Sequence, residues 1–260
     1  MSPPASKFIV AVSGLGNATG TGAAVARLFS SALGYRVALI SRARKEVDAL
    51  RDEIKRAGGI AEVFSVDKYE YQDVAAVFAK IQQTWPDGRL KTAVWNTAQW
   101  SNIPFLDITE RDITLSAATN IVAATAFSQA AVRAFTADGN EEEKGGTLIM
   151  TGATSAWRGK EAFGAFAAGK HGLRALSQSI AREYGPQGVH VAFVVVDGTI
   201  ITKRTLEMFG TRAGMEVNWL HDEKRRLSPE SIARAYLYLH QQTPDAWTLE
   251  MDLRPAKEKF

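Results

Sequence analysis

The stretch Ser13-Gly14-Leu15-Gly16-Asn17-Ala18-Thr19-Gly20-Thr21-Gly22 lies between an apolar run and the pattern of an amphipathic helix. The run before it, residues 8–12, is rich in β-branched and aromatic side chains, which favours a buried strand. After it, apolar residues recur at helical spacing up to Leu33, and Gly34 is a predicted helix stop. A strand that turns through glycines into a helix presents backbone N–H groups and a positive dipole end to a phosphate. We therefore predict a nucleotide-binding turn, the alternative being a glycine-rich turn without a ligand.

The composition is that of an ordinary globular protein, with 46% apolar and 23% charged residues in a chain of 260. Its 31 basic and 28 acidic side chains leave a net charge of +3, and the basic residues are scattered. The short basic run at 224–226 is typical of a solvated helix face rather than of a nucleic-acid-binding patch. Because the chain has no cysteine, disulfides, catalytic thiolates and cysteine-ligated metals are excluded, and we predict no metal site.

The location of the protein is predicted from two further features. Residues 1–7 lack the basic and apolar regions of a signal peptide. The longest apolar run, residues 191–196, is far too short to cross a membrane. We therefore expect a cytoplasmic protein, with neither a membrane nor a nucleic acid as its partner.

Strand and helix patterns alternate along the whole chain. Helices are expected at about 110–136 and 163–184, and others between about 202 and 242. Strands joined by crossover helices form right-handed βαβ units and a parallel sheet. With no linker or repeat, residues 1–260 are predicted to form a single doubly wound α/β domain, a Rossmann fold of about seven strands with its ligand at their carboxyl ends. After the first strand, the others are expected at 37–40, 61–66, 90–95, 147–150, 189–196 and 248–253.

The residues after the strand at 37–40 indicate which nucleotide binds. NAD-selective sites usually place a carboxylate here for the ribose hydroxyls, whereas the 2′-phosphate of NADP requires a cation. This chain has Ser41 and Arg42 at the position, followed by Arg44 and Lys45. An arginine guanidinium matches the geometry of phosphate oxygens. We therefore predict NADP(H) as the cofactor, the alternative for these basic residues being a solvated helix start.

The glycine spacing Gly16-x-x-x-Gly20-x-Gly22 resembles that of the short-chain dehydrogenases/reductases, and the resemblance extends through the strand at 189–196. Asp67 matches the adenine-contacting aspartate of that family. Asn96-Thr97-Ala98-Gln99 is similar to its Asn-Asn-Ala-Gly motif but lacks the glycine. The glycine turn and the resemblance together predict cofactor contacts from Gly14, Gly16, Asn17, Thr19, Gly20, Thr21, Gly22, Ser41, Arg42, Asp67, Asn96, Ala98, Lys170, Gly198, Thr199, Ile200 and Thr202.

The catalytic positions of the family are only partly matched. Its members usually carry an Asn–Ser–Tyr–Lys tetrad, with the Tyr and Lys one helical turn apart. Here Lys170 is present, but Phe166 stands in the place of the tyrosine and has no proton to give. The serine position falls at Ala153, so that a small shift of the loop would bring in a neighbouring hydroxyl. The resemblance thus implies the catalytic set Lys170, Asn120, Phe166, Thr154 and Ser155.

The reaction is predicted from the presence of Lys170 and the absence of the catalytic tyrosine. Reduction of a carbonyl makes an alkoxide that needs acid help, whereas an iminium ion gives a neutral amine directly. Tyr69, Tyr71 and Tyr184 are expected on other elements and are poor substitutes for the missing acid. The Phe166 replacement and the Asp197-Gly198 pair resemble a divergent fungal branch that includes imine or iminium reductases of alkaloid pathways, one type of which guides a cycloaddition.

We therefore predict an NADPH-dependent reductase of an imine, an iminium ion or another acceptor that needs no tyrosine acid, in secondary metabolism. The alternatives are a non-catalytic NADP(H)-binding protein and a cyclase or isomerase that uses the same pocket.

The substrate is expected to be a small apolar or cationic organic molecule. Trp100, Trp157 and Asp197 are the candidate contacts, because each follows a strand at the predicted site. The segment at about 203–226, with apolar residues such as Met208 and Trp219, is the expected substrate lid. The family resemblance also implies a homodimer or homotetramer.

Overall fold

The computed structural model describes residues 6–42, 45–137, 144–210, 219 and 222–258. Seven parallel strands form one sheet in the order β3-β2-β1-β4-β5-β6-β7, which confirms the predicted doubly wound architecture. Successive strands are added outward in opposite directions from β1 and β4, so the switch point of the sheet lies between these two. The strands are β1 (Phe8–Ser13), β2 (Arg36–Ser41), β3 (Ala61–Ser65), β4 (Arg89–Trp95), β5 (Gly146–Thr151), β6 (Val189–Val196) and β7 (Glu250–Leu253).

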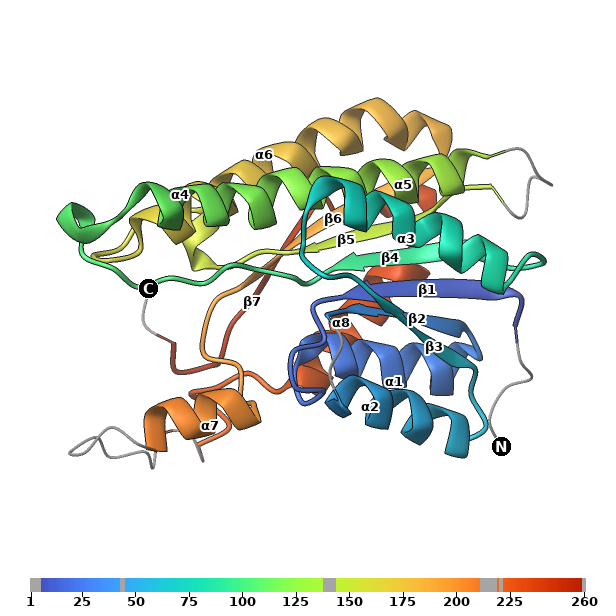
Figure 1. Ribbon diagram of the computed structural model, residues 1–260, viewed down its shortest axis with the longest axis horizontal. Coiled ribbons are helices and arrows are strands. Elements are labelled where there is room, and N and C mark those ends of the chain that lie inside the picture. The colour runs from blue at the N-terminus through green and yellow to red at the C-terminus, as the bar shows by residue number, and fades with distance from the viewer. Residues whose placement is uncertain (1–5, 43–44, 138–143, 211–218, 220–221, 259–260) are drawn as a thin grey trace.

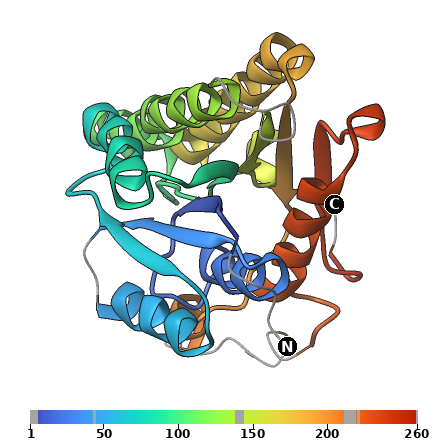
Figure 2. The same cartoon turned by 90° about the vertical axis from the view of Figure 1, so that its right-hand side faces the viewer.

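Helices cover both faces of the sheet, as Figures 1 and 2 show. The side chains of β1 alternate between two cores: Ile9 and Ala11 pack with one layer of helices, Val10 and Val12 with the other. The first layer holds α3 (Tyr71–Thr84), α5 (Ala124–Thr136) and α6 (Gly164–Tyr184), with α4 (Glu110–Ala117) packed against α6. The second layer holds α1 (Thr21–Leu33), α2 (Lys45–Arg56) and α8 (Pro229–Gln241). The remaining helix, α7 (Lys203–Gly210), follows the loop after β6.

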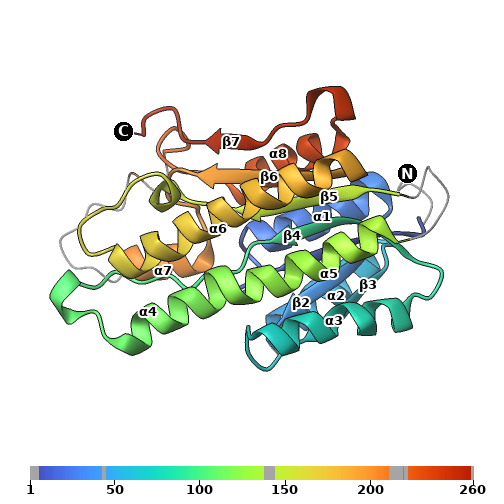
Figure 3. The same ribbon diagram turned by 90° about the horizontal axis from the view of Figure 1, so that it is seen from above.

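The helix expected at about 110–136 is continuous but contains a wider turn. A π-helical segment, η2 (Ala118–Ala123), separates α4 from α5. Helix α6 lies beside this long helix (Figure 3), and Gly169 lets the two approach closely. A Cβ atom on Gly169 would lie 2.6 Å from Ser116 Oγ and 2.7 Å from Asn120 Nδ2. The close approach therefore holds Asn120 next to the part of α6 that carries Lys170.

By length and composition alone, the described helix Glu110–Thr136 could cross a membrane. Half of its most apolar window is buried, and core helices of soluble proteins pass the same test, so this is weak evidence for a span. Apolar side chains on its outer side are exposed, among them Ile113, Leu115 and Val122. The expected homodimer or homotetramer and the cytoplasmic location stay predictions.

Two strands are shorter than expected, while β1, β2, β4 and β5 each extend one residue beyond the expected range at one or both ends. Strand β3 ends at Ser65, one residue early, and β7 begins at Glu250 instead of residue 248. The backbone of Thr248 is occupied by side chains: its N–H donates to Gln242 Oε1 (2.9 Å), and its carbonyl oxygen lies 2.9 Å from His190 Nε2. These contacts satisfy Thr248 outside the sheet, so the ladder starts later.

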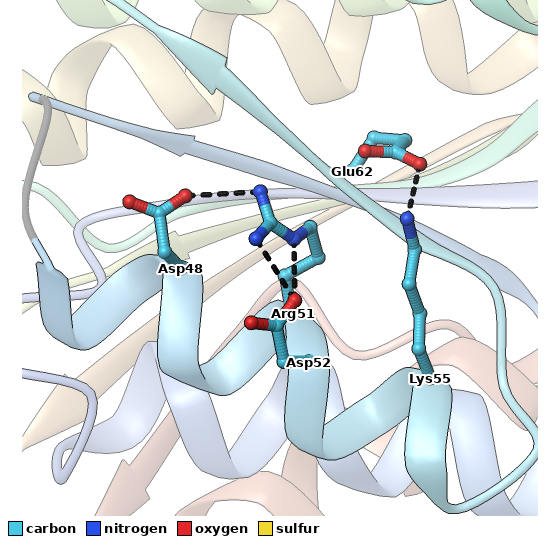
Figure 4. A network of polar contacts seen from close by, with 5 residues as sticks. All are labelled: Asp48, Arg51, Asp52, Lys55 and Glu62. Carbon is cyan, nitrogen blue, oxygen red and sulfur yellow. Dashed lines mark hydrogen bonds and ion pairs between the residues drawn. The ribbon is translucent and has the colours of Figure 1, made fainter.

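The outer surface of α2 carries a polar network, drawn in Figure 4. Arg51 pairs with Asp48 (3.0 Å) and Asp52 (2.8 Å), and Lys55 Nζ lies 2.5 Å from Glu62 Oε1 on β3. Exposed ion pairs of this kind contribute little to stability. The buried residues of the opposite face, Val47, Leu50 and Ile54, hold α2 on the sheet.

Candidate active site

The glycine turn after β1 is fixed against the turn after β4. Gly14 has a φ of 76°, a left-handed conformation that favours glycine, and a Cβ atom there would lie 2.4 Å from the carbonyl carbon of Asn96. Asn96 Nδ2 donates to Gly14 O (2.7 Å), and the Asn96 backbone N–H donates to Ser13 Oγ (3.3 Å). The loop after β1 and the loop after β4, which both belong to the predicted cofactor site, therefore pack as a single unit.

Helix α1 begins directly behind this unit and has no side-chain cap at its N-cap residue, Gly20. The N-terminal N–H groups of a helix need acceptors, and its dipole favours a negative charge there. The Thr21 hydroxyl and, on the neighbouring turn, the Thr97 hydroxyl are buried without a partner among the described residues. A Cβ atom on Gly22 would lie 2.8 Å from Gly14 O, so only glycine lets the helix start so close to the turn. These features fit the pyrophosphate of a dinucleotide.

A cavity of about 470 Å³ extends from the glycine turn to the end of β2. Arg42 and Tyr69 both line this cavity, and the Arg42 guanidinium lies 6.0 Å from the centre of the Tyr69 ring. Asp67 and Arg42 both line a smaller adjoining cavity of about 220 Å³. The larger cavity is lined by nine of the predicted cofactor residues: Gly14, Gly16, Asn17, Gly20, Ser41, Arg42, Asn96, Ala98 and Thr202. Leu15, Tyr69, Thr97, Arg204 and Glu207 also line it and were not predicted from the sequence.

A second cavity, of about 510 Å³, adjoins the first at the carboxyl ends of the central strands. The two share Gly20, Asn96 and Thr202 among their lining residues. A dinucleotide placed along both would have one end at Arg42 and the other at Lys170. The second cavity brings together the predicted residues Thr21, Trp100, Thr154, Ser155, Phe166, Lys170, Asp197, Gly198, Thr199 and Ile200.

Lys170 is a buried cation on the wall of this cavity. Its side chain follows Phe166 by one turn of α6, and Nζ donates to Thr151 O (2.8 Å). Nζ lies 5.9 Å from the centre of the Phe166 ring, so an aromatic face covers the ammonium group where a phenol would offer a proton. Burial lowers the pKa of Lys170 to about 8, because desolvation disfavours the charged form.

Asn120 lies behind the cavity and not on its wall. Its Nδ2 atom donates to Ser116 Oγ (3.2 Å) and Gln99 O (3.4 Å), while Oδ1 is buried with no partner among the described residues. The residue sits in the π turn, a local geometry that recurs at functional sites. The predicted catalytic asparagine is thus connected to the site by its hydrogen bond to Gln99 and by the close approach of α6 at Gly169.

Thr154 and Ser155, the two hydroxyl residues predicted in place of the family's serine, lie in a 3₁₀ turn, η3 (Thr154–Ala156). Both Thr154 and Ser155 line the cavity. Thr154 Oγ1 donates to Asp197 Oδ1 at the end of β6, and Asp197 Oδ2 lies 3.5 Å from Arg254 Nη2. Thr154 therefore joins the cavity wall to a buried carboxylate.

Aromatic rings form one side of the cavity. Trp100 meets Phe163 edge-on with ring centres 6.0 Å apart, and Phe163 meets Phe166 at 6.2 Å. Trp157 is not among the lining residues, and its ring instead lies 6.0 Å from the Arg254 guanidinium. Its predicted substrate contact stays a prediction.

Six further residues that were not predicted from the sequence also line the second cavity: Thr151, Gly152, Lys160, Phe163, Val196 and Glu258. The loop position of Lys160 and Phe163, just ahead of the helix that carries Phe166, was a usable signal. Glu258 had none, because it arrives through a tertiary fold-back: a Cβ atom on Gly198 would lie 3.6 Å from Glu258 Oε2.

Other predicted residues lie around the cavities instead of lining them. Thr19 Oγ1 donates to Asn17 Oδ1 (2.7 Å) and accepts from the Lys203 N–H (3.2 Å), so it links the glycine turn to α7. Of the expected lid at about 203–226, residues 211–218 and 220–221 lie outside the described residues, as does Arg44 after β2.

The tyrosines that the sequence analysis set aside as acids are all occupied elsewhere. Tyr69 Oη donates to Ile40 O (3.5 Å), Tyr71 Oη donates to Gln129 Oε1 (2.5 Å), and Tyr184 packs against the core. None of the three lines the cavity around Phe166.

Comparisons with known proteins agree with this arrangement. A family model described as enoyl-(acyl carrier protein) reductase matches residues 14–249. The short chain dehydrogenase/reductase dpchG of Colletotrichum higginsianum is 28% identical over 195 residues, which cover 75% of this chain and 70% of that protein.

Solved structures are similar along the whole chain. A short-chain dehydrogenase from Rhodopseudomonas palustris is 30% identical, with a TM-score of 0.76, and the match covers 96% of this chain and 99% of that one. An L-sorbose reductase from Gluconobacter frateurii, solved with NADPH and L-sorbose, has a TM-score of 0.84 over 100% of both chains. At 19% identity, this second likeness supports the fold alone.

Proposed function

Because the chain belongs to the short-chain dehydrogenase/reductase family, we propose that it is an NADP(H)-dependent reductase whose acceptor needs no tyrosine acid, with an imine or iminium ion as the acceptor. The observation that carries the proposal is the pairing of Lys170 with Phe166. The residue expected to hold the cofactor ribose is buried in place, and an aromatic ring covers it where the proton donor would stand.

The described residues fit NADP(H) along the joined cavities. The uncapped start of α1 and the glycine turn would take the pyrophosphate, and Arg42 would take the 2′-phosphate. When bound, the nicotinamide supplies a hydride.

The acceptor is inferred from proton balance. A ketone that takes a hydride becomes an alkoxide and needs a proton at once, whereas an iminium ion becomes a neutral amine. The rings of Phe166 and Phe163 already face Lys170 and Lys160 at 5.9 and 5.7 Å. The exposed ring of Trp100, which also lines the cavity, would offer an iminium ion a cation–π contact worth roughly 0.5–2 kcal/mol. The net charge of the cavity does not by itself favour a cationic substrate, because two lysines and two carboxylates line it: Lys160, Lys170, Asp197 and Glu258. A role in secondary metabolism stays a prediction.

Stereospecifically deuterated NADPH tests the proposal. The protein is incubated with a panel of cyclic imines, and the amines are analysed by mass spectrometry; a matched panel of ketones is the control. We expect deuterium in at least one amine and little in the alcohols. Binding of NADPH without deuterium transfer to any imine would contradict the proposed reaction and favour the binding-protein or cyclase alternatives.

Arg42 is expected to set the preference for NADPH over NADH. Arg42→Ala removes a charge-assisted contact, which should weaken NADPH binding by about 1–3 kcal/mol and leave NADH binding nearly unchanged. Calorimetric titration of both cofactors measures the effect. The exposed Arg234→Ala on α8 is the matched control. Equal affinity of the unmutated protein for both cofactors would refute the assignment.

A further inference from the structure

Asp197 lies on the wall of the second cavity, and both of its carboxylate oxygens have partners. Oδ1 accepts the hydroxyl proton of Thr154, and Oδ2 lies 3.5 Å from Arg254 Nη2. The Asp197 N–H donates to Leu253 O (2.8 Å), which fixes the residue against β7, and the whole residue is only 3% exposed. A carboxylate has no proton to give, so it sets the direction of its hydrogen bond with Thr154.

That direction decides what Thr154 offers to a substrate. A threonine hydroxyl has one proton and two acceptor lone pairs. Asp197 holds the proton in a charge-assisted bond, stronger than the bond a neutral carbonyl could offer in exchange. The free capacity of the hydroxyl is therefore acceptor capacity. A ketone oxygen, which only accepts, gains nothing from it, whereas an N–H group gains a hydrogen bond.

We propose that Thr154, oriented by Asp197, is a hydrogen-bond acceptor that selects iminium ions carrying an N–H over fully substituted iminium ions and over ketones. The inference rests on the proposed function for the class of substrate and names the feature that this class must carry. Arg254 is a positioning residue: its Nη2 donates to Asp252 Oδ2 and also lies 3.5 Å from Asp197 Oδ2, so one guanidinium attracts Oδ2 and leaves Oδ1 for Thr154.

Binding of matched probes tests the inference separately from hydride transfer. The probes are 3,4-dihydroisoquinolinium, at a pH where it is protonated, and its N-methyl derivative, which differ in N–H against N–CH₃; 1-tetralone is a ketone of similar shape. Dissociation constants are measured by calorimetry with and without NADP⁺, so no turnover is needed. We expect the N–H cation to bind about tenfold or more tightly than the N-methyl cation, as a hydrogen bond to a charged group predicts.

Three variants locate the source of that preference. Thr154→Val should bring the ratio of the two dissociation constants close to one, and Thr154→Ser should restore it. Thr84→Val is the matched control, because the Thr84 hydroxyl bonds only to Lys80 O (2.9 Å) among the described contacts and is exposed on α3. Its ratio should equal that of the unmutated protein.

Asp197→Asn should reverse the direction of the hydrogen bond between residue 197 and Thr154. Arg254 attracts the amide oxygen, so the amide nitrogen faces Thr154 and frees the hydroxyl proton for the cavity. The affinity for 1-tetralone relative to the N–H cation should then rise several-fold.

Equal binding of the two cations by the unmutated protein, no saturable binding of either, or an unchanged ratio in Thr154→Val would each overturn the inference. A retained preference in a protein that transfers no deuterium to imines would instead uphold the inference and refute the proposed reaction.

Discussion

Replacing Lys170 with methionine is expected to make the cofactor-free protein more stable and to reduce turnover at least about 100-fold. Burial lowers the pKa of Lys170 from 10.5 to about 8, so the unfolded chain binds this proton more tightly than the folded one. At pH 7 the buried charge thus costs on the order of 3 kcal/mol of unfolding free energy. Methionine fills a similar volume without a charge, and we expect it to recover about 1–3 kcal/mol.

The pH dependence has a definite sign. The cost of the charge is fully present below pH 8 and disappears as the pH rises toward 10.5, so the stability difference between Lys170→Met and the unmutated protein should shrink over that range. Urea unfolding at pH 7 and pH 10 measures it, with the exposed Lys80→Met on α3 as control. A less stable Lys170→Met at pH 7 would show that the ammonium group has partners that compensate its burial.

Phe166→Tyr is expected to add ketone reduction to the activity of the protein. The new phenol would stand one helical turn from Lys170, whose Nζ lies 5.9 Å from the centre of the present ring. A positioned general acid contributes typically 10²–10⁴-fold, and we expect a gain of that size in kcat/KM for ketones, with imine reduction changed only several-fold.

Phe163→Tyr provides the matched control for this gain. It adds the same hydroxyl to the same aromatic wall, but to the ring that faces Lys160 at 5.7 Å, and should not raise ketone turnover. If Phe166→Tyr folds and binds NADPH but reduces ketones no faster, the missing phenol is not what limits the reaction.

The fold could be predicted because it depends on local patterns. The apolar periodicity and Gly34, whose φ of 63° closes α1, located β1 and α1 well. Pairwise side-chain contacts carry no such pattern. The predicted start of β7 was wrong because the side chains of Gln242 and His190 form hydrogen bonds with the backbone of Thr248.

The candidate site, too, could be predicted where it depends on local sequence patterns and not where it depends on tertiary contacts. Predicted residues of the glycine turn and of α6, such as Gly16 and Lys170, line the two cavities, because their spacing in the sequence is their spacing in the structure. Their contacts with a cofactor stay predictions. The choice between Thr154 and Ser155 stayed open, since the partner that distinguishes Thr154, Asp197, follows a different strand. Glu258 was missed for the same reason: its place depends on the path of the chain after β7.

The π turn at Ala118–Ala123 has a consequence for how the chain can change in length during evolution. Loss of one residue at the start of α5 would rotate everything beyond it by about 100° and turn Phe127 and Phe135 out of the core. Within the π turn, the same loss would convert the wide turn into an ordinary one and leave both flanking faces in phase. The helix can therefore shed a residue there and still fold, but the turn that holds Asn120 would be lost with it.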